Sequence, residues 1–257
     1  MLRYEVQDKT ALITLSRPEK RNAFNRELTQ RITEAFQEAG RDTAVRGVLL
    51  QAEGPAFCAG ADLAYLQSLQ NYSAEENLYD SRAVAAMYRA IYTLPKPVAC
   101  AVQGPALAGG AGLASVCDYV VASPEATFGY TEVRIGFIPA IVSYFLVRRI
   151  GRAKAAPLLL SGRIIPAVEA RELGIVQEVC SLSDLHEKAW NHLQKIYREV
   201  SPAAYATTKH MLDALPLMPL DQALEEAAQL NAQARMTEDC RRGVAAFLNK
   251  KALDWNS

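Results

Sequence analysis

Histidine and cysteine, which most metal and redox sites require, are scarce in this sequence. Among 257 residues there are three histidines and five cysteines, and no two cysteines form a C-x-x-C pair. His186 and His192 are not at the i, i+4 spacing that places two zinc ligands on one helix face. Neither a G-x-S-x-G nor a phosphate-binding loop motif occurs. We therefore expect no metal site, no serine hydrolase and no nucleotide-hydrolysing enzyme.

Net charge and long apolar runs are also absent. Lysine plus arginine and aspartate plus glutamate each number 28, whereas a nucleic-acid-binding protein normally carries a basic excess. No apolar run approaches the roughly 18 residues that cross a bilayer. The first residues resemble neither a secretory signal nor an Arg- and Ser-rich presequence, and the odd number of cysteines is typical of reduced thiols. We expect a cytoplasmic protein with no nucleic-acid and no membrane partner.

Two glycine-rich turns, each directly after a buried apolar run, are the most informative feature that is present. The first elbow is residues 57–62 (F-C-A-G-A-D), and the second elbow is residues 104–112 (G-P-A-L-A-G-G-A-G). Each pattern predicts a strand, a tight turn and the start of a helix. Backbone N–H groups at such a turn lack an intrahelical partner, and small residues let a ligand approach the backbone. Together, the two turns predict a pair of donors for one developing negative oxygen.

The two elbows resemble signature segments of the crotonase (enoyl-CoA hydratase/isomerase) superfamily. Residues 131–139 (T-E-V-R-I-G-F-I-P) are similar to a third segment of that family, and residues 17–25 (R-P-E-K-R-N-A-F-N) to an N-terminal one. The resemblance covers nearly the whole chain. It implies an α/β fold in which a crotonase-like spiral of ββα units precedes a C-terminal helical oligomerisation region. Residues 1–195 would form the core that binds and converts a CoA thioester, and residues 196–257 would build a homotrimer or a dimer of trimers.

The same resemblance implies roles for individual residues. The backbone N–H groups of Ala61 and Gly109 would hold the thioester oxygen, and Glu132 would be the catalytic carboxylate. The acyl-CoA substrate carries its own coenzyme A, so we expect no further cofactor and no metal ion. The substrate-binding residues that it implies are Arg21, Ala23, Ala59, Ala61, Asp62, Leu63 and Gly109, with Lys20, Lys250 and Lys251 as further candidates for the CoA phosphates.

Ordinary structural roles compete with these assignments. Taken alone, Glu132 is typical of a surface glutamate paired with Arg134. Asp62 is typical of a helix cap after the first elbow, and Asp118 of a structural carboxylate at the start of a strand. An apolar stripe in residues 220–236 favours packing against the chain's own core, whereas the resemblance favours contacts between subunits.

Gly112 is where the sequence departs from the family pattern. The best-known hydratases carry a second glutamate at this position, three residues after the oxyanion glycine. With Glu132 as the single acid, the hydratase interpretation comes first by a narrow margin, and a Δ3,Δ2-enoyl-CoA isomerase is the main alternative. A methylglutaconyl-CoA hydratase-like enzyme and a non-enzymatic CoA-binding scaffold are the others. If the missing acid limits hydration, Gly112→Glu is expected to help.

Hydrophobic periodicity and capping residues predict most helices and strands. Asn25 is expected to cap the first long helix, and the Ser73–Glu76 spacing predicts a capping box. Gly151 and Gly174 are expected to end helices, and Pro157 to kink or shift one. The predicted strands are 2–6, 10–15, 47–51, 97–102 and 119–122, and the predicted helices are 25–39, 73–94, 110–116, 140–150, 167–173, 185–200, 202–212, 220–236 and 238–249.

Overall fold

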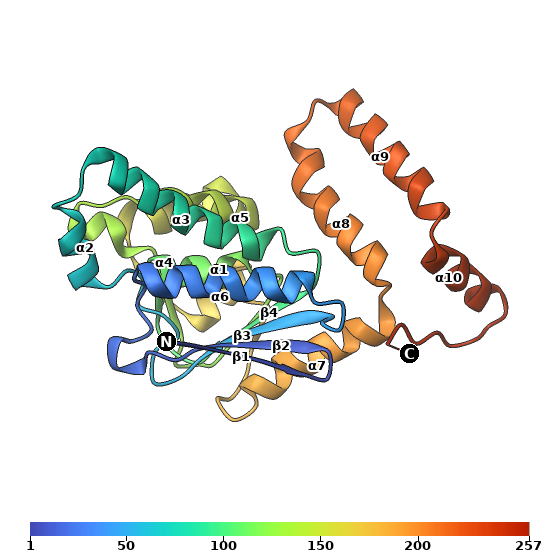
Figure 1. Ribbon diagram of the computed structural model, residues 1–257, viewed down its shortest axis with the longest axis horizontal. Coiled ribbons are helices and arrows are strands. Elements are labelled where there is room, and N and C mark those ends of the chain that lie inside the picture. Colours follow the sequence, from blue (N-terminus) through green and yellow to red (C-terminus); the bar gives the residue numbers. More distant parts are fainter. Residues whose placement is uncertain (257) are drawn as a thin grey trace.

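A six-stranded sheet lies at the centre of the protein, which is described for residues 1–256 by a computed structural model (Figure 1). Its strand order is β1-β2-β3-β4-β6-β9. The first pair is antiparallel, and the other neighbours run parallel. The strands are β1 (Leu2–Gln7), β2 (Thr10–Leu15), β3 (Gly47–Ala52), β4 (Val98–Val102), β6 (Tyr119–Ala122) and β9 (Glu178–Val179).

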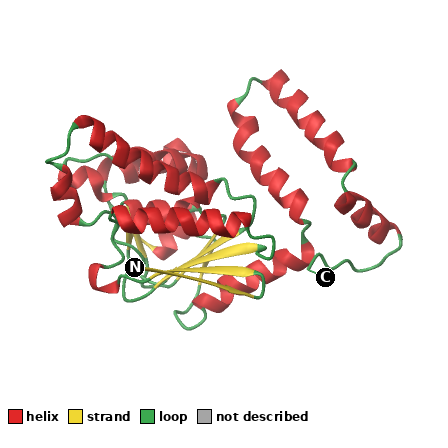
Figure 2. Ribbon diagram, viewed as in Figure 1, coloured by secondary structure: helices red, strands yellow, loops and turns green. Residues whose placement is uncertain are grey.

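Helices cover both faces of this sheet (Figure 2), which explains why β2 and β4 are buried along their whole length. One face packs against α1 (Arg26–Arg41) and α3 (Ala74–Tyr92) in the main apolar core. The other face packs against α7 (Leu185–Glu199), whose buried Leu193 and Tyr197 contact a smaller apolar cluster. These layers account for the near-continuous apolar runs in the central strands.

A second, three-stranded sheet joins the second elbow to the segment just before Glu132. Its order is β5 (Ala106–Leu107), β7 (Thr127–Gly129) and β8 (Ile164–Pro166), with β5 and β7 parallel. The helix α4 (Gly109–Val116) starts within the second elbow, directly after β5. The remaining elements of the body are η1 (Pro18–Lys20), α2 (Leu63–Leu69), η2 (Thr131–Ile135), α5 (Ala140–Ser161) and α6 (Ala167–Leu173).

The predicted helix caps are confirmed. Asn25 accepts a hydrogen bond from the backbone of Leu28, and Ser73 and Glu76 form a complete capping box at the start of α3. Gly174 ends α6 in the left-handed conformation. Gly151 breaks α5 with φ 75° and ψ 155°, whereas the backbone stays helical at Pro157. The prediction of a kink at Pro157 is therefore wrong, and the helix is broken at Gly151 instead.

The last three helices form an arm that extends from the body (Figure 1). The arm consists of α8 (Pro202–Ala214), α9 (Leu220–Arg235) and α10 (Glu238–Leu248), with the short turn η3 (Leu215–Leu217) after α8. None of these helices has a buried residue in the described chain. Leu220 and Leu224 of the α9 stripe are 72% and 59% exposed, so its expected packing against the chain's own core is wrong. The boundary predicted at residue 195 falls within α7.

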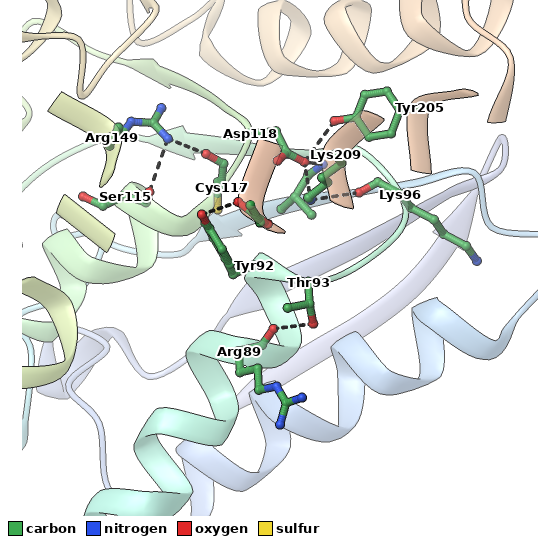
Figure 3. A network of polar contacts seen from close by, with 12 residues as sticks. Arg89, Tyr92, Thr93, Lys96, Ser115, Cys117, Asp118, Arg149, Tyr205 and Lys209 are labelled. Atoms are coloured by element: carbon green, nitrogen blue, oxygen red, sulfur yellow. Dashed lines mark hydrogen bonds and ion pairs between the residues drawn. The ribbon is translucent and has the colours of Figure 1, made fainter. Parts of the chain in front are cut away.

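Polar contacts join the arm to the body at the base of α8 (Figure 3). Asp118 accepts hydrogen bonds from the backbone of Val98, from Lys209 at 2.7 Å and from Tyr205 at 3.1 Å. Its predicted structural role is confirmed. Half-buried Arg149 donates to the carbonyl oxygens of Ser115 and Cys117, at the C-terminal end of α4. These contacts fix the end of α4 opposite the second elbow.

Two negative findings concern the part of the chain that the structure describes. No helix within residues 1–256 combines the length and hydrophobicity needed to cross a membrane. The same residues contain no cluster of three or more histidine, cysteine, aspartate or glutamate side chains arranged to hold a metal ion.

The packing of α4 predicts that Gly110→Ala destabilises the protein strongly. An ideal Cβ at Gly110 would lie 2.0 Å from the carbonyl oxygen of Cys58, which is backbone of the first elbow and cannot move alone. We expect a loss of about 2–3 kcal/mol in the free energy of unfolding, measured by denaturant titration. Gly243→Ala is the matched control, because it also lies in a helix but its Cβ would meet only Trp255 at 3.5 Å. A similar loss in both variants would contradict the explanation.

Candidate active site

The two elbows touch each other through their backbones. Gly60 adopts φ 85°, and an ideal Cβ on it would lie 2.8 Å from the Cβ of Ala108 and 2.9 Å from the carbonyl oxygen of Leu107. The Leu107 N–H donates to the carbonyl oxygen of Cys58 at 2.9 Å, in a bridge between the first elbow and β5. Glycine is required at positions 60 and 110 because any side chain would separate the elbows.

This contact brings together two backbone donors that were predicted from the sequence. On either side of Ala61, Gly60 accepts from the Phe24 N–H and Asp62 donates to the Phe24 carbonyl, so the Ala61 N–H faces away from this bridge. Gly109 is the first residue of α4. Within residues 1–256, neither the Ala61 nor the Gly109 N–H donates to a protein acceptor. An ideal Cβ on Gly60 would lie 3.4 Å from the Gly109 nitrogen, so the donors belong to one site.

Backbone strain marks the entry to α4. Ala108, the residue before the helix, has φ 48° and ψ −122°, and no side chain caps the helix N-terminus. Its N–H donates to the Gly129 carbonyl at 2.6 Å, which holds the strained peptide against β7. Non-glycine residues in such conformations cluster at functional sites. Here the strain turns the following N–H, that of Gly109, outward at the positive end of the helix dipole.

Glu132 lies in η2 as a buried, unpaired carboxylic acid. The residue is 9% exposed, and its Oε2 atom is buried without a hydrogen-bond partner among the described residues. Burial raises the pKa of Glu132, because the charged form loses water without gaining a counter-ion. The surface pairing with Arg134 that would make Glu132 an ordinary residue is absent from the described ion pairs. Glu132 thus has the environment of an acid–base group.

Glu132 and the second elbow are linked through Tyr88 of α3. The phenol of Tyr88 donates to the Gly109 carbonyl at 2.7 Å. Burial, followed by the electrostatic influence of Cys58 and Glu132, raises the pKa of Tyr88. Glu132 also follows Gly129 by three residues, and the Gly129 carbonyl accepts from the Ala108 N–H beside the Gly109 turn.

The position of the missing second acid is filled. An ideal Cβ on Gly112 would lie 2.3 Å from Val142 Cγ1 and 2.9 Å from the phenolic oxygen of Tyr88. A glutamate at position 112 would have room only if Val142 and Tyr88 moved, and the expected gain from Gly112→Glu stays a prediction. The space beside Gly112 is thus taken by Val142 and Tyr88 and holds no second carboxylate.

The other predicted substrate-binding residues line the first elbow and the turn after η1. Arg21 is exposed, and its carbonyl accepts from the Ala59 N–H at 3.0 Å. Ala23 is only 6% exposed, Ala59 is half-buried, and Leu63 is 73% exposed. Lys20 is exposed beside Arg21.

Asp62 has the capping role expected from its position, together with an ion pair that was not predicted. It accepts from the Ala64 N–H at 3.0 Å and pairs with Arg17 at 2.9 Å. Burial alone would raise the pKa of Asp62, but the hydrogen bonds from Arg17 and from the backbone of Ala64 and Tyr65 outweigh it, and the pKa is lowered. Asp62 is therefore an ionised structural anchor for the first elbow.

Asn22 is the site residue that the sequence reasoning missed. It is fully buried with φ 54°, and its amide donates to the carbonyl oxygens of Glu53 and Ala56. Its side-chain oxygen accepts from the Arg17 N–H at 2.8 Å. Asn22 therefore ties residues 17–25 to the segment leading into the first elbow. The sequence signal for Asn22 was its position in the R-N-A-F-N run. An asparagine buried there would need several hydrogen-bond partners.

Comparisons with known proteins point to one family. Residues 5–257 match the model of a family described as enoyl-CoA hydratase/isomerase. The chain is 42% identical to a Thermus thermophilus protein with an enoyl-CoA hydratase name, covering 94% of this chain and 95% of that protein. It is 32% identical to the 2,3-dehydroadipyl-CoA hydratase of Escherichia coli, and the match covers 97% of this chain and 96% of that protein. The solved enoyl-CoA hydratase of Mycobacterium smegmatis superposes with a TM-score of 0.92 at 29% identity, covering 100% and 99%.

The burial of Glu132 predicts that Glu132→Gln stabilises the protein at alkaline but not at acidic pH. In the folded state the raised pKa favours the protonated acid. Ionisation therefore costs stability as the pH rises from the unfolded pKa of about 4.3 through the higher folded value. At pH 4, where the acid is mostly protonated in both states, wild type and variant should melt alike. At pH 8 the variant should have a melting temperature several degrees above that of wild type. Each kcal/mol of stability gained by avoiding the buried charge should raise the melting temperature by about 2–4 °C.

Glu172→Gln is the matched control for this comparison, because Glu172 is exposed on α6. Its melting difference from wild type should not change sign or size between the two pH values. A Glu132→Gln variant that melts below wild type at pH 8 would show that the carboxylate is stabilised by its surroundings.

Proposed function

Because the chain belongs to the enoyl-CoA hydratase/isomerase family, we propose that it adds water to the double bond of a 2-enoyl-CoA thioester. The observation that carries the proposal is the pair of free backbone donors, on Ala61 and Gly109, with the buried, unpaired carboxyl of Glu132 three residues after Gly129, which accepts from the Ala108 N–H. The names of the relatives support an acyl-CoA substrate. The substrate's own coenzyme A is the only carrier in this proposal, and no metal or further cofactor takes part.

The thioester oxygen is the group that the elbows would hold. In the proposed complex it accepts hydrogen bonds from the N–H groups of Ala61 and Gly109, and the first turn of α4 adds its positive potential. When a nucleophile attacks C3, electrons move from the double bond to this oxygen. The fixed donors stabilise the enolate with no reorganisation, and one such donor is worth about 10²–10³ in rate.

Glu132 would perform both proton transfers. Its carboxylate takes one proton from water, the remaining hydroxide adds to C3, and the same proton is then returned to C2 as the enolate collapses. The net change is H at C2 and OH at C3, and Glu132 ends ionised as it began. A raised pKa makes this carboxylate a stronger base than an exposed one.

Isomerisation is the second candidate, and the closed Gly112 position is the observation that favours it. Moving a double bond from C3 to C2 needs one base, which takes a proton from C2 and returns it at C4. Glu132 alone supplies this, with the same two backbone donors holding the enolate. A methylglutaconyl-CoA hydratase-like activity is a branched-substrate version of the first candidate.

The CoA part would lie along the first elbow. Arg21, which is exposed beside Ala59, would meet a phosphate, and Leu63 would offer its exposed apolar surface near the turn. Ala23 and Asp62 are buried, so their contribution would come through the backbone and through anchoring of the elbow. A role in fatty-acid β-oxidation and a cytoplasmic location stay predictions.

A homotrimer or dimer of trimers is proposed from the arm. Its exposed leucines, such as Leu220 and Leu224, would be covered by a second copy of the chain. Light scattering should give the mass of a trimer or hexamer, and replacing both leucines by glutamate should shift it toward the 28.2 kDa monomer. A wild-type protein that scatters as a monomer at micromolar concentration contradicts the proposal.

Two substrates separate the candidate activities. With crotonyl-CoA, a hydratase causes loss of the conjugated thioester absorbance and forms a 3-hydroxyacyl-CoA. With a 3-enoyl-CoA, an isomerase causes that absorbance to appear. We expect the first reaction in wild type, and Glu132→Gln should lower its kcat by at least about 10²-fold, because proton transfer is lost.

Glu172→Gln serves as the activity control and should equal wild type. If wild type converts the 3-enoyl-CoA but not crotonyl-CoA, the isomerase proposal replaces the hydratase proposal. If wild type binds acyl-CoA without turning over either substrate, the scaffold alternative replaces both.

A further inference from the structure

Tyr88 is a buried tyrosine that touches the second elbow from another element. It lies on α3, 21 residues before Gly109 in the chain, and is 1% exposed. Its phenol donates to the Gly109 carbonyl at 2.7 Å. The same phenolic oxygen would lie 3.0 Å from an ideal Cβ on Gly109 and 2.9 Å from one on Gly112. The phenol therefore packs against the whole first turn of α4.

That first turn has few restraints of its own. Three of its first four residues are glycine, which has the largest conformational freedom, and no side chain caps the N-terminus. A catalytic donor must nevertheless hold a fixed direction, because misplacement by 1 Å can cost about 10²-fold in rate. The helix supplies one bond to this peptide, from the Gly112 N–H to the Ala108 carbonyl, so further restraint has to come from outside the helix.

The peptide that carries the Gly109 N–H is anchored on both sides. Before it, the Ala108 N–H is tied to the Gly129 carbonyl at 2.6 Å. After it, the Gly109 carbonyl is tied to Tyr88. The Ala108 carbonyl, in the same peptide as the Gly109 N–H, also accepts from the Gly112 N–H at 3.1 Å. Removing the Tyr88 bond would therefore loosen the direction of the Gly109 N–H rather than free it. Of these anchors, Tyr88 is the one made by a side chain, so it can be removed by substitution.

Tyr88 also occupies the space that a second carboxylate would need. Burial, the largest cause, raises the pKa of Tyr88 and keeps its phenol neutral, so it acts as a hydrogen-bond donor across the working pH range. A donor at this place supports the backbone, whereas a carboxylate there would add a second acid. The phenol and the absence of a side chain at Gly112 are thus two parts of one arrangement.

We propose that Tyr88 is a positioning residue, which fixes the direction of the Gly109 N–H through its hydrogen bond to the Gly109 carbonyl. The inference rests on the proposed function, because it assumes that this N–H holds the thioester oxygen. Tyr88 does not contact the reacting atoms. It determines how strongly the second elbow polarises them.

The test compares Tyr88→Phe with wild type, using butyryl-CoA labelled with ¹³C at the thioester carbonyl. This saturated thioester binds without being hydrated, and infrared difference spectra report the polarisation of its carbonyl. Wild type should shift the bound carbonyl stretch to lower frequency, and Tyr88→Phe should lose most of the shift. For crotonyl-CoA, kcat should fall about ten-fold with KM changed by less than about two-fold.

Tyr92→Phe is the matched control. Tyr92 lies one turn further along α3, but its phenol donates to Asp213 at the C-terminal end of α8. This variant removes the same atom from the same helix and should keep the wild-type carbonyl shift. If Tyr88→Phe does not fold, 4-aminophenylalanine at position 88 restores a donor and should retain the shift.

The outcomes separate the two hypotheses. If wild type itself produces no carbonyl shift, the proposed function fails, because the elbows do not hold the thioester oxygen. If wild type shifts the carbonyl and Tyr88→Phe shifts it equally, the role of Tyr88 is overturned. A folded 4-aminophenylalanine variant without the shift overturns it as well.

Discussion

Backbone contact between the two glycine elbows is the constraint on which the rest of the structure depends. Gly60 and Gly110 leave room for one main chain to lie directly on another, and a single methyl group at position 110 would overlap the carbonyl of Cys58. Neighbouring elements hold this contact in place. The strands β3 and β4 lead into the two elbows, and Tyr88 of α3 donates to the Gly109 carbonyl. Because the donors are backbone atoms, their chemistry is determined by packing rather than by side-chain identity.

A single carboxylate next to this contact gives the site its reactive character. Glu132 is buried without a counter-ion, while Asp62, a few residues along the first elbow, is paired with Arg17 and ionised. Burial raises the pKa of Glu132, and hydrogen bonds lower that of Asp62. The pKa values of these two carboxyl groups are therefore shifted in opposite directions, which fits the proposed proton transfer by Glu132 and the anchoring role of Asp62.

Local features were predictable from the sequence, and contacts between distant segments were not. Asn25 and the Ser73–Glu76 box act within a few residues, so their roles follow from spacing alone. The filled space at Gly112 depends on Val142, 30 residues away in the chain, and on Tyr88, and no local pattern encodes that meeting. Hydrophobic periodicity could not predict the exposure of the α9 stripe either. An amphipathic pattern shows that a helix has an apolar face, but not which surface covers that face.

The central claim is that the N–H groups of Ala61 and Gly109 hold one acyl oxygen beside Glu132. A crystal structure of the protein with a non-reactive acyl-CoA tests it most directly. The account predicts that the thioester oxygen lies about 2.7–3.1 Å from both nitrogens, with C2 and C3 facing the Glu132 carboxyl. A thioester oxygen bound away from either nitrogen, with ordered density for the acyl chain elsewhere, would contradict it.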